Sequence, residues 1–186
     1  MGTAYHFTVA EFDRMIERDV FQDDAQVELI RGEIQTMVPP NPAHEDVVDR
    51  LMYWSVDVTA RDEIRVRIQN SVGLPEFDSV PEPDVAWMRA RDYRLQRPQA
   101  GDVLLLIEVS DSSLAKDRLV KGPLYAQAGI QEYWIVNLVD SCLEVHRQPS
   151  GRGYGSITVH SGDETVHPFC APAAGLSLGR LFGQCE

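Results

Sequence analysis

Cysteine is scarce in this chain, and the few cysteines present are scattered. Cys142, Cys170 and Cys185 are the three cysteines among 186 residues, and no two of them form a CxxC pair. Structural zinc sites and disulfide frameworks depend on closely or regularly spaced cysteines. The sequence therefore suggests neither, and a reducing compartment is the expected environment.

Long apolar runs are also lacking. No stretch approaches the roughly 20 apolar residues that are needed to span a bilayer. The first residues, MGTAYHFTVAEFDRM, contain no basic segment followed by an apolar one, which is the pattern of a secretory signal. We therefore expect no membrane partner and a cytoplasmic location.

Positive charge is in short supply over the whole chain. There are 17 Lys and Arg against 29 Asp and Glu, so the formal net charge is −12. This balance argues against broad, nonspecific binding to nucleic acid. The basic residues are concentrated, however, because 10 of the 17 lie between residues 61 and 121. Ordinary solvated surfaces are the alternative explanation of this concentration.

The chain does contain enough apolar material for one folded domain, at 44% hydrophobic residues. Periodicity predicts helices and strands along its whole length. In order, we expect a capped helix after Thr8, a hairpin over 27–38, a helix over 43–59, strands over 64–74, 83–88 and 103–109, a helix over 114–128 that stops at Gly129, a strand over 131–138, a hairpin over 142–160 and a short tail. This order predicts an α/β (α+β) fold with one mixed sheet.

One predicted strand ends in a carboxylate. The stretch LLLIEVSDSS, residues 104–113, runs from aliphatic residues straight into Glu108. Side chains alternate along strands, and Asp84 occupies an equivalent position at one end of the strand over 83–88. If the two strands are neighbours, Asp84 and Glu108 meet, and two adjacent carboxylates repel unless a proton or a cation lies between them. Carboxylate oxygens suit Mg²⁺ or Mn²⁺, which can promote phosphodiester hydrolysis.

The helix that follows this strand contains a candidate for the positive group of a hydrolytic site. Asp117 and Lys121 are four residues apart, so they share a helix face, and Lys121 is free to point back over the strand end. The structural alternative is that Asp84 caps a turn, that Glu108 pairs with an arginine and that Asp117 and Lys121 form a surface ion pair.

Several blocks of the sequence resemble the Uma-type endonuclease family of the PD-(D/E)XK, or restriction-endonuclease-like, nuclease superfamily. They are VELIRGEI followed by PPNPAH, then PDVAW, IEVSDSS and KDRLVKGPLYAQAGIQEYWIVN. The resemblance implies one restriction-endonuclease-like domain over 1–186, with a mixed sheet flanked by helices. It would comprise an N-terminal helix and hairpin over 1–40, a nuclease core over 41–138, and a C-terminal hairpin and tail over 139–186. The resemblance also implies that Asp84 and Glu108 are the metal-binding acids.

The sequence departs from the superfamily pattern at one position. The pattern has a lysine two residues after the acid, where this chain has Ser110. The resemblance implies that the lysine is displaced to the next helix, where Lys121 matches it. Lys116 is a weaker candidate, because it precedes the capping region. Asp84, Glu108 and Lys121 are then the expected catalytic residues, and Asp117 is a possible accessory.

Other matched positions suggest accessory residues. Glu28 and Glu33 match an acidic pair of the family's first hairpin, and either is a candidate for a further metal ligand; a hairpin ion pair is the alternative. His44 matches a histidine at the start of the long helix, and it is a candidate for phosphate contact or proton transfer. A local hydrogen bond is the alternative for His44. Tyr125, four residues after Lys121, is expected to pack over the same site.

The resulting hypothesis is an Mg²⁺- or Mn²⁺-dependent endonuclease acting on nucleic acid, with DNA as the expected substrate. The four arginines of RARDYRLQR, residues 89–97, are candidates for phosphate contacts. The alternatives are a noncatalytic interaction protein that retains the nuclease fold and a hydrolase of another small phosphate ester. The three tryptophans, Trp54, Trp87 and Trp134, are expected in the core rather than stacked on bases.

A homodimer is also predicted. QEYWIV, residues 131–136, and the hairpin after it place large apolar side chains on what we expect to be an edge of the sheet. Exposed apolar edges tend to be paired or covered. A two-fold dimer is the commonest way to do so, and its two sites would suit the cutting of both strands of a duplex.

Overall fold

A six-stranded mixed sheet forms the centre of the computed structural model, which describes residues 3–21 and 25–183. Its strand order is β3-β4-β5-β6-β7-β8. The strands are β3 (Ile64–Ile68), β4 (Val85–Arg89), β5 (Val103–Ser110), β6 (Glu132–Asn137), β7 (Cys142–Ser150) and β8 (Gly153–Ser161). Only the β5–β6 pair within this order is parallel, and the helical segment between the two strands makes the crossover that a parallel pair requires. The predicted mixed sheet is therefore confirmed.

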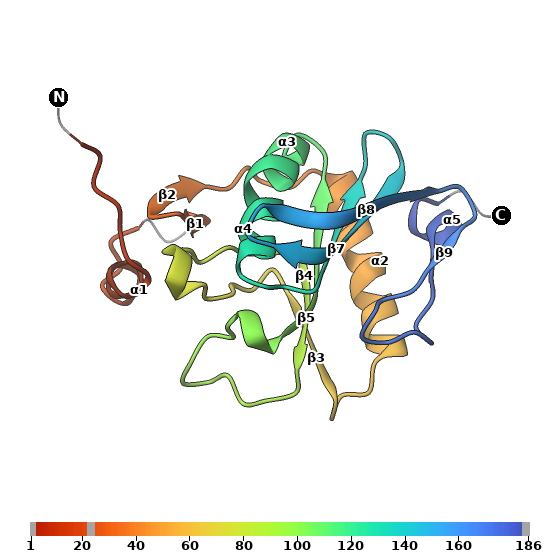
Figure 1. Cartoon of the computed structure of the whole chain (residues 1–186), viewed down its shortest axis with the longest axis horizontal. Coiled ribbons are helices and arrows are strands. Elements are labelled where there is room, and N and C mark those ends of the chain that lie inside the picture. The colour runs from red at the N-terminus through yellow and green to blue at the C-terminus, as the bar shows by residue number, and fades with distance from the viewer. Residues whose placement is uncertain (1–2, 22–24, 184–186) are drawn as a thin grey trace.

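Helices cover both faces of this sheet (Figure 1). The long helix α2 (Pro42–Val58) lies on one face, and the crossover segment lies on the other. That segment consists of α3 (Leu114–Lys116), the π-helical turn η3 (Asp117–Lys121) and α4 (Gly122–Gln127). The smaller elements are α1 (Val9–Glu17), the hairpin β1 (Val27–Ile30) and β2 (Glu33–Thr36), the 3₁₀ turns η1 (Pro75–Phe77) and η2 (Ala100–Asp102), the short pair β9 (Thr165–Val166) and β10 (Leu176–Ser177), and α5 (Leu178–Leu181).

The face under α2 is an apolar core. Trp54 stacks on Trp87 and Trp134, with ring centroids 5.0 and 6.0 Å apart, and the last two are fully buried. Val85, Trp87, Leu105 and Ile107 point into this core because alternate residues of a strand share a face. The prediction that the tryptophans belong to the core is confirmed. No described helix is both long enough and apolar enough to cross a membrane.

The N-terminal elements bring the first hairpin to the opposite face. Thr8 and Glu11 form the predicted capping box of α1. Arg31 and Gly32 make the hairpin turn with φ angles of 50° and 79°, a conformation that glycine adopts without strain. β1 is held beside the loop before β4 by backbone hydrogen bonds between Leu29 and Val80. Glu28 is thereby fixed near the start of β4.

Two expectations about strands are wrong. β3 ends at Ile68 instead of continuing to residue 74, because Gln69 turns into the left-handed region with φ 47°. β6 is not an edge strand, since it pairs with β5 on one side and β7 on the other, and all of its residues are buried. The aromatic side chains of QEYWIV are therefore interior, and β3 and β8 are the edges.

The glycine that ends the crossover helix provides a test of the local structure. Gly129 has φ 78° and open space where a β-carbon would lie, so Gly129→Ala should be destabilising by about 1 kcal/mol through backbone strain alone. Gly101 is the matched control, because it has similar space without a positive φ. Urea unfolding should show Gly101→Ala within about 0.5 kcal/mol of the wild type. Equal effects of the two substitutions would contradict the assignment of strain to residue 129.

Candidate active site

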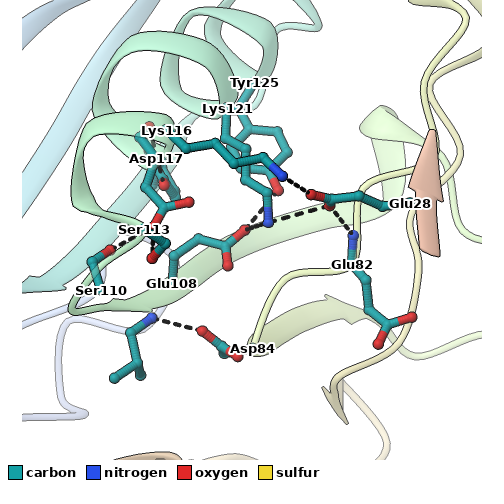
Figure 2. Close-up of polar contacts among 12 residues, drawn as sticks. Glu28, Glu82, Asp84, Glu108, Ser110, Ser113, Lys116, Asp117, Lys121 and Tyr125 are labelled. Atoms are coloured by element: carbon teal, nitrogen blue, oxygen red, sulfur yellow. Dashed lines mark hydrogen bonds and ion pairs between the residues drawn. The ribbon is translucent and has the colours of Figure 1, made fainter. Parts of the chain in front are cut away.

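Asp84 and Glu108 lie next to each other on the face of the sheet under α4. β4 and β5 are antiparallel, and their register pairs Val85 with Ile107. The same register places Asp84, the residue before β4, opposite Glu108, and opposite residues point to the same face. Figure 2 shows the two carboxylates turned toward each other from neighbouring strands. The structure thus brings together the two acids that the sequence pattern paired.

Asp84 is held by two contacts to one of its oxygens. Its Oδ2 accepts a hydrogen bond from the Val109 backbone N–H at 2.8 Å and lies 3.2 Å from Nε2 of His44. His44 reaches this position from the first turn of α2, which Asn41 caps. Burial by itself would lower the pKa of His44, but the hydrogen bond and the charge of Asp84 raise it above its usual value. The histidine thus helps to hold the Asp84 side chain in position.

Glu108 is buried among groups that both oppose and support its charge. Its Oε1 accepts hydrogen bonds from Lys121 Nζ at 3.0 Å and from the Tyr125 hydroxyl at 2.9 Å. Burial raises the pKa of Glu108 well above its usual value; the Lys121 charge lowers it, whereas neighbouring carboxylates including Asp117 and Asp84 raise it. Additional positive charge near Glu108 would therefore lower its pKa and stabilise its ionised form.

Glu28 is a second buried carboxylate near the site, and it contacts both Lys116 and Lys121. It is 1% exposed, and its oxygens lie 2.6 Å from Lys116 Nζ and 3.3 Å from Lys121 Nζ. Burial raises the pKa of Glu28, but the two lysines together lower it by more than burial raises it. The net shift of this pKa is therefore downward. Both oxygens are engaged by lysines, so Glu28 acts as a counter-ion in this structure. Glu33 is exposed on β2 and does not line the same cavity.

Ser110 and Asp117 form a polar link between the strand end and the crossover helix. Asp117 is buried and accepts hydrogen bonds from the hydroxyls of Ser110 at 2.7 Å and Ser113 at 2.6 Å. The wider π-helical turn η3 ends two residues before Pro123, which lacks an N–H and cannot take part in regular α-helical bonding. In place of a lysine, residue 110 therefore supplies a hydroxyl that anchors the helix carrying Lys121.

These side chains surround a cavity of about 340 Å³. Its lining includes six carboxyl groups against two lysines, namely those of Glu28, Glu82, Asp84, Glu108, Asp111, Asp117, Lys116 and Lys121. The described residues contain no group of three or more His, Cys, Asp or Glu arranged to hold a metal ion. Mg²⁺ commonly uses only one or two protein carboxylates, together with waters and phosphate oxygens. One oxygen each of Asp84 and Glu108 has no protein partner in the described hydrogen bonds, so this donor set fits such a cation.

The structure separates the predicted candidates clearly. Asp84, Glu108, Lys121, Glu28, His44 and Asp117 all line the cavity, and Glu33 does not. Lys121 contacts Glu108, whereas Lys116 contacts Glu28. Sequence reasoning overlooked the anchoring by Ser113, whose spacing of four residues from Asp117 was a usable signal. It also overlooked the backbone N–H of Val109, for which no side-chain pattern exists.

Comparisons with known proteins identify a nuclease family and a similar fold. The Uma2 family, described as "Putative restriction endonuclease", matches residues 9–179. The fold resembles the crystal structure of a protein from Anabaena variabilis described as "a putative nuclease belonging to DUF820", with a TM-score of 0.74 and 18% sequence identity. That similarity covers 95% of this chain and 98% of the other. No curated protein matches the sequence significantly.

The hydrogen bond from Tyr125 to Glu108 allows a direct test of the site geometry. Tyr125→Phe should be destabilising by about 1.5 kcal/mol, because a buried, charged acceptor loses a donor. Tyr133 is a matched control, since it is equally buried and its hydroxyl lies 3.5 Å from the Asp117 carbonyl, a weak contact. Chemical unfolding should show a clearly smaller loss for Tyr133→Phe. Equal losses would mean that the bond to Glu108 adds nothing.

Proposed function

Because the chain belongs to the Uma2 family of restriction-endonuclease-like proteins, we propose that its cavity hydrolyses phosphodiester bonds of DNA with the help of a divalent cation, Mg²⁺ or Mn²⁺. The observation that carries this proposal is the facing pair Asp84 and Glu108, with the buried ammonium of Lys121 bonded to the second acid. The family description, a restriction endonuclease, favours DNA as the substrate.

Asp84 and Glu108 are the residues that would hold the cation. When bound, such an ion supplies positive charge that polarises the phosphodiester and makes water more acidic. The contribution of the chain is to hold the two carboxyl groups in fixed positions. The Val109 N–H and His44 hold Asp84, and Lys121 and Tyr125 hold Glu108.

Lys121 has a second task in the proposed reaction. Burial lowers its pKa, but Glu108 and Glu28 raise it more strongly, so the side chain stays protonated. A fixed ammonium beside the scissile phosphate stabilises the negative charge that develops on the nonbridging oxygens. Its position is fixed in advance by two carboxylates, so little reorganisation is required during the reaction.

The cost of this arrangement argues against a purely noncatalytic role. Burying ionised groups is expensive, and apolar replacements of the same size are often neutral or more stable. Glu28, Glu108, Asp117 and Lys121 are all 5% exposed or less and converge on one cavity. A protein that used only its outer surface would gain stability by replacing them.

Cleavage assays provide the primary test. Plasmid, linear duplex, single-stranded DNA and RNA should be incubated with Mg²⁺ or Mn²⁺ and with a chelator. We expect cleavage of DNA that requires the added cation and is abolished by the chelator. Full activity in the chelator would contradict metal dependence. Hydrolysis of a small phosphate ester without cleavage of any polymer would favour the alternative hydrolase.

Three variants distinguish the assigned roles. Lys121→Met should lower turnover at least about a hundredfold, the usual scale for losing one preorganised charge, while calorimetry still detects Mn²⁺ binding. Asp84→Asn should lose both metal binding and activity. Lys116→Met is the matched control and should cause a much smaller loss, since Lys116 contacts Glu28 only. Abolished activity in Lys116→Met with full activity in Lys121→Met would reverse the assignment.

We also propose a homodimer, now through β8 instead of the interior strand β6. β8 is an edge strand, and Ile157 and Val159 are 56% and 62% exposed on it. Exposed apolar edges favour pairing with a second copy. Light scattering should give a dimer mass, and Ile157→Lys combined with Val159→Lys should give a monomer. A monomer mass for the wild type at every concentration would remove this proposal.

A further inference from the structure

Arg67 is an arginine of edge strand β3 that the described residues leave without a matching anion. Its Nε is buried and has no hydrogen-bond partner among them. The guanidinium lies 5.9 Å from the centre of the Tyr93 ring, which supports its flat face without neutralising its charge. Buried or half-buried charges are normally paired, so an anion bound beside Arg67 would be stabilising.

The charges nearest to Arg67 make its environment still less favourable. Burial lowers the pKa of Arg67 and the like charge of Arg65 lowers it further; Tyr93 raises it, and Arg97 lowers it by less than any of these. Arg65 is exposed on the same strand and donates a hydrogen bond to the Arg91 carbonyl at 2.8 Å. Arg65 and Arg67, which we call the β3 arginine pair, thus form a local positive site on a strongly acidic protein.

Three of the four arginines in the loop that sequence reasoning selected for phosphate contacts are paired with acids, one from the loop itself and two from elsewhere in the chain. Arg91 pairs with Asp102 at 2.8 Å, and Arg94 pairs with Asp92 at 2.6 Å. Arg97 likewise pairs with Asp13 at 2.6 Å. These three arginines already have anionic partners, and the fourth, Arg89, donates its Nε–H to the Gly101 carbonyl, so much of the positive charge of the loop is already engaged.

The β3 arginine pair lies on the same face of the sheet as the candidate active site. Arg67 is opposite Ala86, and Arg65 is opposite Met88. Asp84 is two residues before Ala86 and therefore shares this face. Gln69, the residue just after β3, donates its backbone N–H to the Asp84 carbonyl and lines the cavity. The two arginines thus continue from the cavity along β3, spaced by roughly 7 Å.

We propose that the β3 arginine pair binds backbone phosphates of the nucleic-acid strand whose scissile bond enters the cavity. This inference rests on the proposed function, and it identifies where the strand lies. Guanidinium groups match phosphate oxygens in a two-pronged geometry, and such contacts position a strand without reading its sequence. Because charges beyond roughly 8 Å are largely screened at physiological salt, the distant acids of the chain do not prevent this contact.

Binding and cleavage are measured separately to test the inference. Fluorescence anisotropy of labelled duplex and single-stranded DNA, in a chelator and over a range of salt concentrations, reports binding alone. Arg67→Met keeps the side-chain stem and removes the charge, so we expect about tenfold weaker binding and a salt slope reduced by about one. Arg67→Lys should keep most of the slope. Kinetic assays with metal should show a raised KM and an unchanged kcat for Arg67→Met.

Arg152→Met is the matched control. Arg152 is exposed in the β7–β8 turn at the opposite edge of the sheet, and its loss changes the net charge equally. We expect this variant to bind like the wild type. We also expect Arg67→Met to melt at or above the wild-type temperature, because it relieves like-charge repulsion.

Each other outcome has a definite meaning. Equal binding by Arg67→Met and the wild type, or equal losses in Arg67→Met and Arg152→Met, overturns the inference. A wild type that binds no nucleic acid overturns it as well. Cleavage by the wild type with unchanged binding and KM in Arg67→Met overturns the inference and leaves the proposed function intact. Selective loss of binding in Arg67→Met, in a protein that cuts nothing with either metal, supports the phosphate contact of Arg67 but overturns the proposed function and, with it, the placement of a scissile bond in the cavity.

Discussion

The buried ammonium of Lys121 is the charge on which the arrangement of the site depends. It lies between Glu108 of β5 and Glu28 of β1, 3.0 and 3.3 Å from their oxygens. Without it, two carboxylates would be buried beside further acids, a cost of several kcal/mol per ion. One side chain from the crossover helix thus joins the central sheet to the N-terminal hairpin. The lysine and its two partners come from three separate elements, so the position of its ammonium depends on how all three dock together.

Alternation along the strands allows the same sheet to provide both stability and chemistry. Ile107 and Val109 point into the tryptophan core under α2, and Glu108 between them points into the cavity. A carboxylate on one face therefore leaves the apolar packing of the other face undisturbed. The interior strand β6, buried along its whole length, supports both faces at once.

The acidic composition of the protein is compatible with a polyanionic substrate because charge is distributed unevenly. Carboxylates exceed lysines in the cavity, which favours a cation at the reacting centre. On β3, Arg67 lacks a matching acid among the described residues, and the like charges of Arg65 and Arg97 lower its pKa. The net charge of −12 limits nonspecific binding without forbidding a specific contact.

Local patterns in the sequence determined the elements and much of the site. Alternating and helical periodicities located the mixed sheet and its helices, and the strand-end acids Asp84 and Glu108 were recognisable because an unpaired buried carboxylate is costly. The tertiary structure alone decided which strands are edges, since pairing partners are distant in sequence; QEYWIV proved to be interior. It also decided that Glu28 enters the site and Glu33 does not, because hairpin docking selects one face. Finally, it showed that three of the four loop arginines are paired with acids and that Arg67 has no anionic partner among the described residues, because the compensation of a charge depends on which groups folding brings within a few ångströms.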